Sequence, residues 1–222
     1  MKNNLVIFAG GLGSRLLNSE KVPKPLVNIN GKSLLSRIIL SFYSKKIISN
    51  FHILTCFESN LFKKILHKEI PHIHLTVHEE GLRTGRSGAL KYFLDVQNMI
   101  DKFFVCNGDT YFMNIKKNEI LDPLNSFEYK PIVYLAPTDN TRNDFKQINL
   151  NFGKVAKSFQ NSGLIYLNKD WFKNKVLKKN NLKDIDDYLF SNKNNSEYAF
   201  LSNQILDAGT PDRLSKLRDI LR

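Results

Sequence analysis

The glycine-rich stretch GGLGSRLLNSEKVPKPL, residues 10–26, carries the residue types that phosphate binding requires. Its three leading glycines let the main chain approach a ligand closely and aim successive N–H groups at an anion. Arg15 adds a fixed fork of donors that suits phosphate oxygens. Pro23 and Pro25 fix the backbone on both sides of Lys24, so its ammonium group is aimed. Lys24 alone is more typical of a solvated surface turn, but together with the glycine loop and Arg15 upstream it predicts a phosphate site.

Two familiar phosphate-binding patterns do not fit this stretch. Residues 11–16 resemble the G-x-G-x-x-G dinucleotide fingerprint, but Leu16 stands where the third glycine belongs, and no acidic residue follows an obvious second strand. Residues 31–33, Gly-Lys-Ser, look like the end of a P-loop, but the glycine required five residues earlier is Leu26. A dinucleotide-dependent dehydrogenase and a P-loop enzyme are therefore weakly supported.

The chain also places acidic residues at two turns. Asp109 ends the Asn-Gly-Asp turn after the apolar run KFFVCN, and Asp207 opens the segment Asp-Ala-Gly-Thr-Pro before the last helix. On its own, each is typical of a turn or cap aspartate. Their distance in the sequence gives no ground for placing them together.

The elements that must position these residues alternate between strand and helix. Apolar runs predict buried strands over 5–10, 51–57, 74–79 and 102–109, and 3.6-residue periodicity predicts helices over 31–46, 59–68 and 88–100. This alternation predicts an α/β fold with a doubly wound, mostly parallel sheet. In such sheets the ligand lies beyond the carboxyl ends of the strands, where the glycine loop and Asn-Gly-Asp both fall.

The second half of the chain is less regular. Strands are expected over 130–136, 162–167 and 197–202, and a closing helix over 210–222 with Thr210 as its N-cap. The polar stretch 137–160 predicts a loop-rich excursion that covers one side of the crevice. We expect one domain over residues 1–222, with two halves, 1–115 and 116–222.

Composition narrows the setting and the partners. The net charge of +12 over 222 residues favours an anionic substrate or a solvated lysine-rich surface. Nucleic acid is not expected as a partner, because the basic residues are scattered and no zinc-finger or RNP signature is present. Cys56 and Cys106 lie inside apolar runs and predict buried free thiols in a reducing compartment. Without a signal peptide or an apolar span of membrane length, we expect a cytoplasmic protein.

Five segments in order resemble the sugar-phosphate nucleotidylyltransferase family. GGLGSRL followed by KVPKPL is similar to the signature G-G-x-G-[ST]-R-L with its P-K-P-L segment, and residues 84–89 are similar to the second glycine-rich turn. Asn107-Gly108-Asp109, residues 161–166 and Asp207 with its Gly-Thr-Pro are similar to the metal segment, the N-[AG]-G-I-Y segment and the D-x-G-T-P segment. The resemblance covers nearly the whole chain. It is greatest to the short bacterial enzymes that activate heptose-1-phosphate or hexose-1-phosphate, of the D-glycero-D-manno-heptose 1-phosphate guanylyltransferase kind.

The resemblance implies a fold, a reaction and a set of roles. It implies a Rossmann-like, glycosyltransferase-A-like three-layer sandwich, and a cytoplasmic transferase that makes an NDP-sugar and pyrophosphate from an NTP and a sugar-1-phosphate for capsule or lipopolysaccharide. Arg15 and Lys24 would be catalytic, and Asp109 and Asp207 would bind Mg²⁺. The implied acceptor-binding residues are Asn161, Gly163 and Arg86. The implied nucleotide-binding residues are Ala9, Gly10, Gly11, Gly13, Ser14, Gly85, Ser87, Gly88 and Asn107.

Two departures from the family pattern leave the acceptor open. Arg86 and Ser87 stand where the family turn usually has threonine- or leucine-type residues and glycine, so Arg86 could read a phosphate or alter base choice. The residues before Asn161 are KVAKSFQ, without the Glu-Lys segment that contacts sugar hydroxyls in many members. The acceptor could therefore be an unusual sugar phosphate or a non-sugar phosphate such as phosphocholine.

Three further readings stay open at this point. One is a cytidylyltransferase for an alcohol phosphate, and another is a catalytically silent nucleotide-binding module. The joint presence of Arg15, Lys24, Asp109 and Asp207 argues against a silent module. Nucleic-acid binding driven by the basic charge is a minor option that a salt-dependent gel shift would reveal. The sequence does not name the base, and the C-terminal helix could pair in a homo-oligomer.

Overall fold

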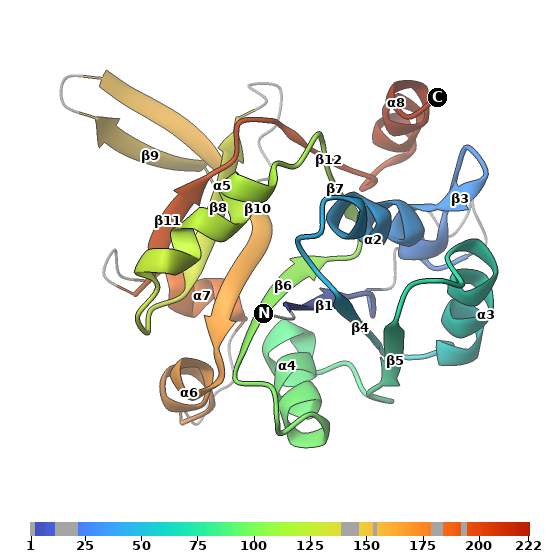
Figure 1. Ribbon diagram of the computed structural model, residues 1–222, viewed down its shortest axis with the longest axis horizontal. Coiled ribbons are helices and arrows are strands. Elements are labelled where there is room, and N and C mark those ends of the chain that lie inside the picture. The colour runs from blue at the N-terminus through green and yellow to red at the C-terminus, as the bar shows by residue number, and fades with distance from the viewer. Residues whose placement is uncertain (1–2, 12–21, 139–146, 153–154, 179–183, 192–194) are drawn as a thin grey trace.

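The computed structural model describes residues 3–11, 22–138, 147–152, 155–178, 184–191 and 195–222. Its centre is a sheet of strand order β11-β8-β10-β6-β1-β4-β5, and β9 pairs with β10 beside this path (Figure 1). The strands of this sheet are β1 (Asn4–Phe8), β4 (Asn50–Thr55), β5 (Leu75–Glu79), β6 (Lys102–Asn107), β8 (Ile132–Pro137), β9 (Gln147–Phe152), β10 (Val155–Asn168) and β11 (Glu197–Phe200).

Most neighbours in the sheet run parallel. The pairs β1–β4, β1–β6, β4–β5 and β8–β11 are parallel, whereas β10 runs antiparallel to β6, β8 and β9. The first half of the chain is therefore a parallel, wound unit, as its alternating pattern predicts. One antiparallel strand then joins it to the second half.

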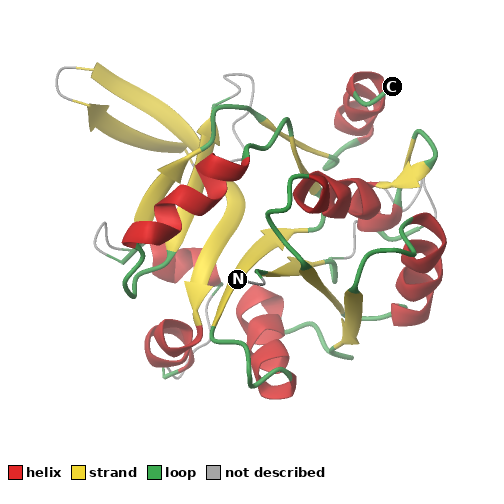
Figure 2. Ribbon diagram, viewed as in Figure 1, coloured by secondary structure: helices red, strands yellow, loops and turns green. Residues whose placement is uncertain are grey.

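Helices cover both faces of the sheet (Figure 2). They are α2 (Leu34–Ser44), α3 (Ser59–Glu69), α4 (Gly85–Val96), α5 (Lys117–Leu121), α6 (Lys169–Phe172), α7 (Ile185–Phe190) and α8 (Pro211–Ile220). Shorter elements are the 3-10 helices η1 (Lys24–Leu26) and η2 (Asp122–Ser126), the π-helical turn η3 (Lys173–Leu177) and the strand pairs β2 (Asn28–Ile29) with β3 (Lys32–Ser33) and β7 (Thr110–Phe112) with β12 (Ile205–Asp207).

Alternation along the central strands divides the core into two clusters. Leu5 and Ile7 of β1 pack on one face with α2, α3, α5 and α8, whereas Val6 packs on the other with α4, α6 and α7. Successive side chains of a strand point to opposite faces, so a strand buried on both faces reads as a continuous apolar run. The three-layer α/β sandwich expected from the sequence is confirmed.

The stretch 137–160 corrects the sequence prediction. Instead of a loop-rich excursion, β9 pairs with the first part of β10, from Phe152 opposite Val155 to Gln147 opposite Gln160. This hairpin extends away from the rest of the sheet (Figure 1). Its ladder is made by main-chain groups, which do not require the apolar pattern that the sequence reading relied on. β10 then continues past an irregularity between Asn161 and Ile165 into the central sheet.

Other expectations hold in detail. Thr210 caps α8, because its hydroxyl accepts a hydrogen bond from the Arg213 N–H. The expected helix over 31–46 begins later, at Leu34, after the β2–β3 turn, and Ser33 is its N-cap. Cys56 and Cys106 are both free and buried. Within the described ranges, no helix combines the length and the apolar character needed to cross a lipid bilayer.

Candidate active site

Lys24 is held in a tight turn. It opens the 3-10 helix η1 directly after Pro23, and the Leu26 N–H closes the turn on the Pro23 carbonyl at 2.7 Å. The Lys24 ammonium donates to Oδ2 of Asp109 at 2.5 Å. The two side chains are 15% and 34% exposed, so the pair can be reached from solvent. The turn therefore aims the lysine at the Asn-Gly-Asp segment.

Gly108 fixes the Asn-Gly-Asp turn against the end of β1. Its N–H donates to the carbonyl oxygen of Phe8 at 2.9 Å. A Cβ built at this position would lie 2.9 Å from the same oxygen and 3.4 Å from Pro25 Cγ. A side chain would push these segments apart, so glycine lets β1, the Lys24 turn and Asp109 meet at one place.

Asp207 is brought beside Asp109 by the small β7–β12 sheet. Asp207 pairs with Thr110 in this antiparallel ladder, and the Ala208 N–H donates to the Asp109 carbonyl at 3.1 Å. The convergence of the two aspartates, which the sequence spacing could not establish, is therefore present in the backbone.

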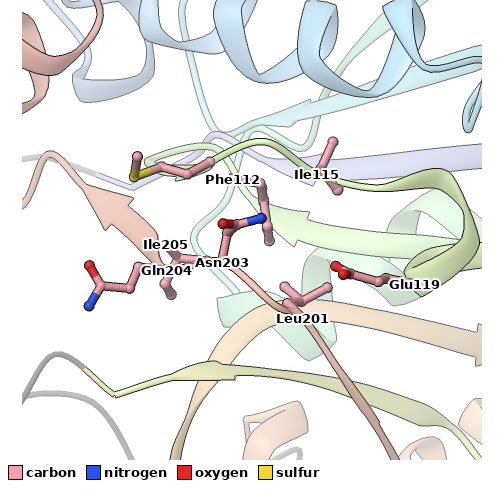
Figure 3. A pocket seen from close by; sticks show the side chains of 8 residues that line it. Phe112, Ile115, Glu119, Leu201, Asn203, Gln204 and Ile205 are labelled. Carbon is pink, nitrogen blue, oxygen red and sulfur yellow. The ribbon is translucent and has the colours of Figure 1, made fainter.

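The β7–β12 sheet packs against closely fitting side chains that leave no room for a ligand. A crevice between β7, α5 and β12 has a volume of only about 10 Å³. Figure 3 shows Phe112, Ile115, Leu201 and Ile205 around it, with Glu119 at one side. The Glu119 carboxylate accepts a hydrogen bond from the Ser202 N–H at 3.1 Å. Since this volume is barely that of one water, the crevice serves to fix the β7–β12 pair.

Asp207 is itself oriented by its neighbours. Its Oδ1 accepts from the Gly209 N–H at 2.6 Å and lies 3.4 Å from the Arg213 guanidinium. A Cβ at Gly209 would lie 2.5 Å from that oxygen, which accounts for the glycine of the Asp-Ala-Gly-Thr-Pro segment. Asp207 is buried, with a side chain 8% exposed. Each aspartate of the site thus faces one basic side chain.

The donor chemistry of this site fits a magnesium ion. Mg²⁺ is usually held by one or two carboxylates together with substrate phosphates, and Asp109 and Asp207 supply two carboxylates on adjoining segments. In the part of the chain that the structure describes, no group of three or more His, Cys, Asp or Glu could hold a metal without further ligands. The ion would therefore depend on phosphate oxygens.

A cavity of about 230 Å³ opens at the carboxyl ends of β1 and β4. We call it the strand-end cavity, and its lining residues are Phe8, Gly10, Gly11, Leu54, Cys56, Glu80, Arg83, Gly85, Arg86 and Ala89. A Cβ at Gly10 would lie 2.6 Å from the Cys56 sulfur, so this glycine lets the loop pass close to β4. Gly10, Gly11 and Gly85, all predicted to bind nucleotide, meet in its wall.

The acidic group in this cavity is partly desolvated. Burial raises the pKa of Glu80, against hydrogen bonds from Thr84 and Cys56 that lower it. Thr84 Oγ1 donates to Glu80 Oε2 at 3.1 Å, and Cys56 Sγ lies 3.7 Å from Oε1. Burial, followed by the nearby Glu80, also raises the pKa of the Cys56 thiol, so a reactive thiolate is not favoured there.

Arg86 forms a two-carboxylate ion pair. It contacts Asp184 Oδ1 at 2.5 Å and Asp186 Oδ2 at 2.9 Å, across from α4 to the start of α7. Burial lowers the pKa of Arg86, but the two aspartates more than offset it and the pKa is raised overall. Asp184 also caps α7 through the Asp186 N–H, as an N-terminal acidic cluster is expected to do. The charge of Arg86 is therefore engaged within the protein.

The remaining predicted acceptor residues lie at the β6–β10 contact. The Gly163 N–H donates to Asn161 Oδ1 at 3.0 Å, with Gly163 at φ +75°. A Cβ at Gly163 would lie 2.8 Å from the Asn107 side-chain amide nitrogen. Asn161 Nδ2 in turn lies 3.4 Å from Asp186 Oδ2. Asn107, Asn161 and Gly163 thus form one polar junction between the two halves of the chain.

The other predicted nucleotide-binding residues divide into two groups. Ala9 and Ser87 are buried next to the cavity, and the Ser87 hydroxyl has no hydrogen-bond partner among the described residues. A Cβ at Gly88 would overlap the Thr84 side chain, so glycine leaves room for that side chain at the start of α4. Gly13 and Ser14, together with Arg15, which the resemblance implies to be catalytic, lie outside the residues that the structure describes.

The sequence reading missed several cavity residues. They are Phe8, Leu54, Cys56, Glu80, Arg83 and Ala89. Glu80 carried a usable signal, since it directly follows a parallel strand, β5, at the edge where ligands bind. The apolar residues carried none, because the same letters are needed to fill the core. The Arg86–Asp184–Asp186 ion pair also had no local signal.

Comparison with known proteins gives the family. The family model described as "Nucleotidyl transferase" matches residues 4–144, more than half of the chain. The chain belongs to the nucleotidyl transferase family. This confirms the resemblance that the five segments carried. The match spans the strand-end cavity, Lys24 and Asp109, whereas Asp207 lies beyond it.

Individual relatives agree with this membership. The chain is 31% identical over 168 residues to the bifunctional protein GlmU from Methanococcus maripaludis, covering 74% of this chain. It spans about a third of that relative's length (35%). Among solved structures, HddC from Yersinia pseudotuberculosis superposes with a TM-score of 0.75 at 21% identity, over 99% of this chain and 100% of that one. The inositol-1-phosphate CTP transferase from T. maritima gives 0.77 at 15% identity, over 99% and 95%. These two likenesses confirm the fold.

Proposed function

We propose that the chain is a nucleotidylyltransferase that joins the nucleotidyl group of an NTP to a heptose or hexose 1-phosphate and releases pyrophosphate. One observation carries the proposal. The end of β1 touches both the strand-end cavity, through Phe8, and the Lys24–Asp109 pair, through the Gly108 N–H bond to Phe8. A nucleoside can therefore lie in the cavity while its phosphates run toward Lys24 and the two aspartates.

In the proposed reaction, an oxygen of the acceptor phosphate attacks the α-phosphorus in line. A bond forms between that oxygen and the α-phosphorus, and the bond to the bridging oxygen of the β-phosphate breaks. The leaving pyrophosphate carries away the electron pair. Such a transfer depends on positioning and on neutralising the phosphate charge rather than on covalent catalysis.

The residues of the chain divide this work. Lys24 would neutralise the α-phosphate and the incoming phosphate, and its contact with Asp109 keeps the ammonium in place beforehand. Arg15, in the glycine loop, would stabilise the leaving pyrophosphate. Asp109 and Asp207 would hold Mg²⁺, which when bound would neutralise charge on the phosphate oxygens. The Gly209 N–H and Arg213 keep Asp207 pointed at one place.

The two halves of the chain take different substrates in this proposal. Residues 1–115 would bind the nucleotide and residues 116–222 the acceptor, with the junction of Asn107, Asn161 and Gly163 between them. Arg86 would act on the acceptor side indirectly, by fixing Asp184 and Asp186. A cytoplasmic location and a product destined for capsule or lipopolysaccharide belong to the same proposal. Support for it comes from the family membership and from the geometry of the strand ends.

The test is pyrophosphate release with Mg²⁺ for each common NTP and dTTP against a panel of sugar-1-phosphates and phosphocholine. We expect release that needs one NTP and one sugar phosphate, and that is lost in Asp109→Asn and on chelation of the metal. Lys117→Ala is the matched control, because Lys117 is exposed on α5, away from the site. Pyrophosphate release with phosphocholine and with no sugar-1-phosphate would show that the acceptor is a non-sugar phosphate. NTP binding without release for any acceptor would point to a silent binding module.

A further inference from the structure

A groove of about 480 Å³ follows α2 from the β2–β3 turn toward the end of the helix. We call it the α2 groove, and its lining residues are Asn30, Gly31, Lys32, Arg37, Leu40, Ser41, Ser44 and Tyr111. It shares no lining residue with the strand-end cavity. Its lining contains two cations, three hydroxyl groups and no carboxylate, so the groove suits an anionic group.

Both cations of the α2 groove are held by main-chain carbonyl groups. The Lys32 ammonium donates to the Glu69 carbonyl oxygen at the end of α3 at 2.9 Å. Arg37 donates through Nε to the Ile29 carbonyl at 2.7 Å and through Nη2 to the Asn30 carbonyl at 2.9 Å. In the described part of the chain, neither cation forms an ion pair with a carboxylate. Both keep further N–H donors, so the groove presents fixed positive charge to a ligand.

Further basic residues adjoin the groove where α2 and α3 end (Figure 1). Lys45 and Lys46 directly follow the groove residues of α2, and both are exposed. The ring of Tyr43, a residue that is 37% exposed, meets the His72 ring edge-on at 5.9 Å, which brings the end of α2 beside the segment after α3. Lys68 is exposed in the last turn of α3. We call the following residues the basic surface: Lys32, Arg37, Tyr43, Lys45, Lys46 and Lys68.

The segments that carry α2 and α3 have an excess of positive charge. Residues 28–74 contain seven lysines and arginines against two glutamates, a net charge of +5 in 47 residues, compared with +12 over all 222. One glutamate, Glu69, is engaged within the protein, because its carboxylate accepts from the Ser33 N–H at 2.8 Å and from the Ser33 hydroxyl at 2.7 Å. The other, Glu58, lies at the opposite end of α3 from Lys68. These segments therefore leave the charge of the basic surface uncompensated.

We propose that the basic surface binds an anionic phospholipid bilayer, with a phosphate head group in the α2 groove beside Lys32 and Arg37. Each lysine or arginine near an anionic leaflet strengthens binding about 5-fold. Lysine stems and a tyrosine ring suit the interface between lipid and water, because each joins an apolar body to a polar tip. Four of the five cations are lysines, whereas nucleic-acid sites favour the planar arginine fork. The inference is independent of the proposed function, since the groove and the strand-end cavity are lined by different residues.

The first experiment measures co-sedimentation of the full chain with vesicles. One set of vesicles contains equal parts of phosphatidylglycerol and phosphatidylcholine, and the other contains phosphatidylcholine alone. At about 50 mM salt, we expect the partition coefficient for the anionic vesicles to exceed that for the neutral ones at least about 20-fold. At about 500 mM salt, this excess should fall at least about 10-fold, because salt screens the charges. Equal partition onto both kinds of vesicle, or binding that salt does not weaken, would overturn the proposal.

The second experiment removes two charges from the basic surface. The double variant Lys45→Gln, Lys68→Gln should lower the partition onto anionic vesicles about 10- to 30-fold. The matched control is Lys173→Gln, Lys175→Gln, which removes the same charge from exposed positions of η3, on the opposite face of the sheet from α2. The control should stay within about 3-fold of the parent chain. Equal losses in the two double variants would show attraction by net charge alone and would overturn the basic surface as the binding site.

The third experiment tests the α2 groove with Arg37→Gln. We expect the partition onto anionic vesicles to fall about 5-fold while the partition onto neutral vesicles stays the same. An anionic partition equal to that of the parent chain would overturn the seat of the head group in the groove. Arg37 also holds the β2–β3 turn through two carbonyl groups, so this variant could fail to fold. The double variants of exposed lysines keep the proposal testable in that case.

Two further probes separate the bilayer from other anions. Glycerol 3-phosphate carries the head-group phosphate without a lipid chain, and calorimetry measures its binding to the full chain. Its binding to the groove without any partition onto vesicles would overturn the bilayer as the source of the phosphate. A fluorescent RNA oligonucleotide should bind more weakly than the anionic vesicles do at the same salt concentration. Tighter RNA binding that is lost in Lys45→Gln, Lys68→Gln would assign the basic surface to nucleic acid and overturn the proposal.

Discussion

Two regions at the carboxyl ends of the strands differ in how their carboxylates are paired. In the phosphate region (Lys24, Asp109, Asp207 and Arg213), each carboxylate faces a basic side chain. In the strand-end cavity, the Glu80 carboxylate accepts a hydrogen bond from the Thr84 hydroxyl and lies near the Cys56 thiol, and burial raises its pKa. In the proposed reaction, the paired charges of the phosphate region would exchange partners when the phosphates and Mg²⁺ bind.

The two regions also differ in what holds them. The phosphate region depends on close main-chain contacts, in which Gly108 and Gly209 leave no space for a Cβ. The cavity depends on the side-chain packing of α4 against β4 and β5, where the rings of His52, His78 and Phe93 contact one another in tilted and edge-on arrangements. Substitutions in the first region should therefore act on turnover or on a tight turn. Changes beneath the second region should act through the protonation of His52 and His78 and through the packing of α4 on β4 and β5.

The largest expected effect is the removal of Lys24. Lys24→Ala should lower kcat/KM for pyrophosphate release about 10²- to 10³-fold, because a preorganised charge at a transferring phosphate is lost. Binding of the base in the cavity should change far less. Steady-state kinetics beside calorimetry separate the two quantities, with Lys117→Ala as the control. A loss below about 3-fold would break the assignment of turnover to the phosphate region.

Low pH should lower the stability of the chain through two buried histidines beneath the strand-end cavity. Burial, with smaller contributions from His78 and His74, lowers the pKa of His52 to about 4, and burial lowers the pKa of His78 as well. The unfolded chain binds these protons at a higher pH than the native chain does. Stability is therefore full above about pH 6.5 and falls toward pH 4, by on the order of 2 to 3 kcal/mol from His52.

The check is urea unfolding as a function of pH. His52→Leu should flatten the loss between pH 6.5 and 4, whereas His67→Gln, at an exposed site on α3, should leave the slope as it is. A parent chain whose stability is constant over this range would contradict the buried, neutral histidine pair. Its ring nitrogens lie 3.2 Å apart, so the two histidines share at most one proton between them.

The tight turn of the phosphate region is tested by Gly108→Ala. The added Cβ would lie 2.9 Å from the Phe8 carbonyl oxygen, and we expect a loss of about 1–3 kcal/mol in the free energy of unfolding. Gly11→Ala is the matched control, because a Cβ there meets nothing within 4 Å. Two variants of equal stability would show that the approach of β1 to the Asn-Gly-Asp turn is looser than described.

Arg86 should show the smallest effect. Arg86→Gln removes the ion pairs to Asp184 and Asp186 and leaves two carboxylates facing each other. Because these side chains are 24% to 40% exposed, solvent screens much of the change, and a loss of about 1 kcal/mol is expected. Thermal unfolding measures it. An unchanged stability with a large rise in KM for the acceptor would instead make Arg86 a direct ligand.

The sequence predicted the first half of the fold closely, and the reasons are physical. Strands buried on both faces, such as β1 and β6, read as continuous apolar runs, and α2 carries a clear helical period. The β9–β10 hairpin escaped prediction because its pairing is made by main-chain groups. The pairing of Asp207 with Thr110 also depends on the complete sheet order, which no local pattern contains.

The candidate site divides in the same way. The sequence indicates Lys24, Gly108 and Gly209 because prolines and glycines mark the tight turns in which these residues lie. The cavity walls are built from residues such as Leu54 and Ala89, whose types are common in any core. The partners of Arg86 come from a helix almost a hundred positions away. Motif spacing therefore finds the phosphate region, and only the fold shows the cavity.

The most direct test of the account follows the two ends of the triphosphate separately. The chain is incubated with Mg²⁺, the sugar-1-phosphate and the NTP that support pyrophosphate release, the NTP being labelled with ³²P at either the α or the γ position. The account predicts that the α label enters a nucleotide sugar and the γ label leaves in pyrophosphate, and that Lys24→Ala slows both together. A γ label that appears on the acceptor, or an α label that stays in free nucleotide while the γ label is released as phosphate, would contradict attack at the α-phosphorus.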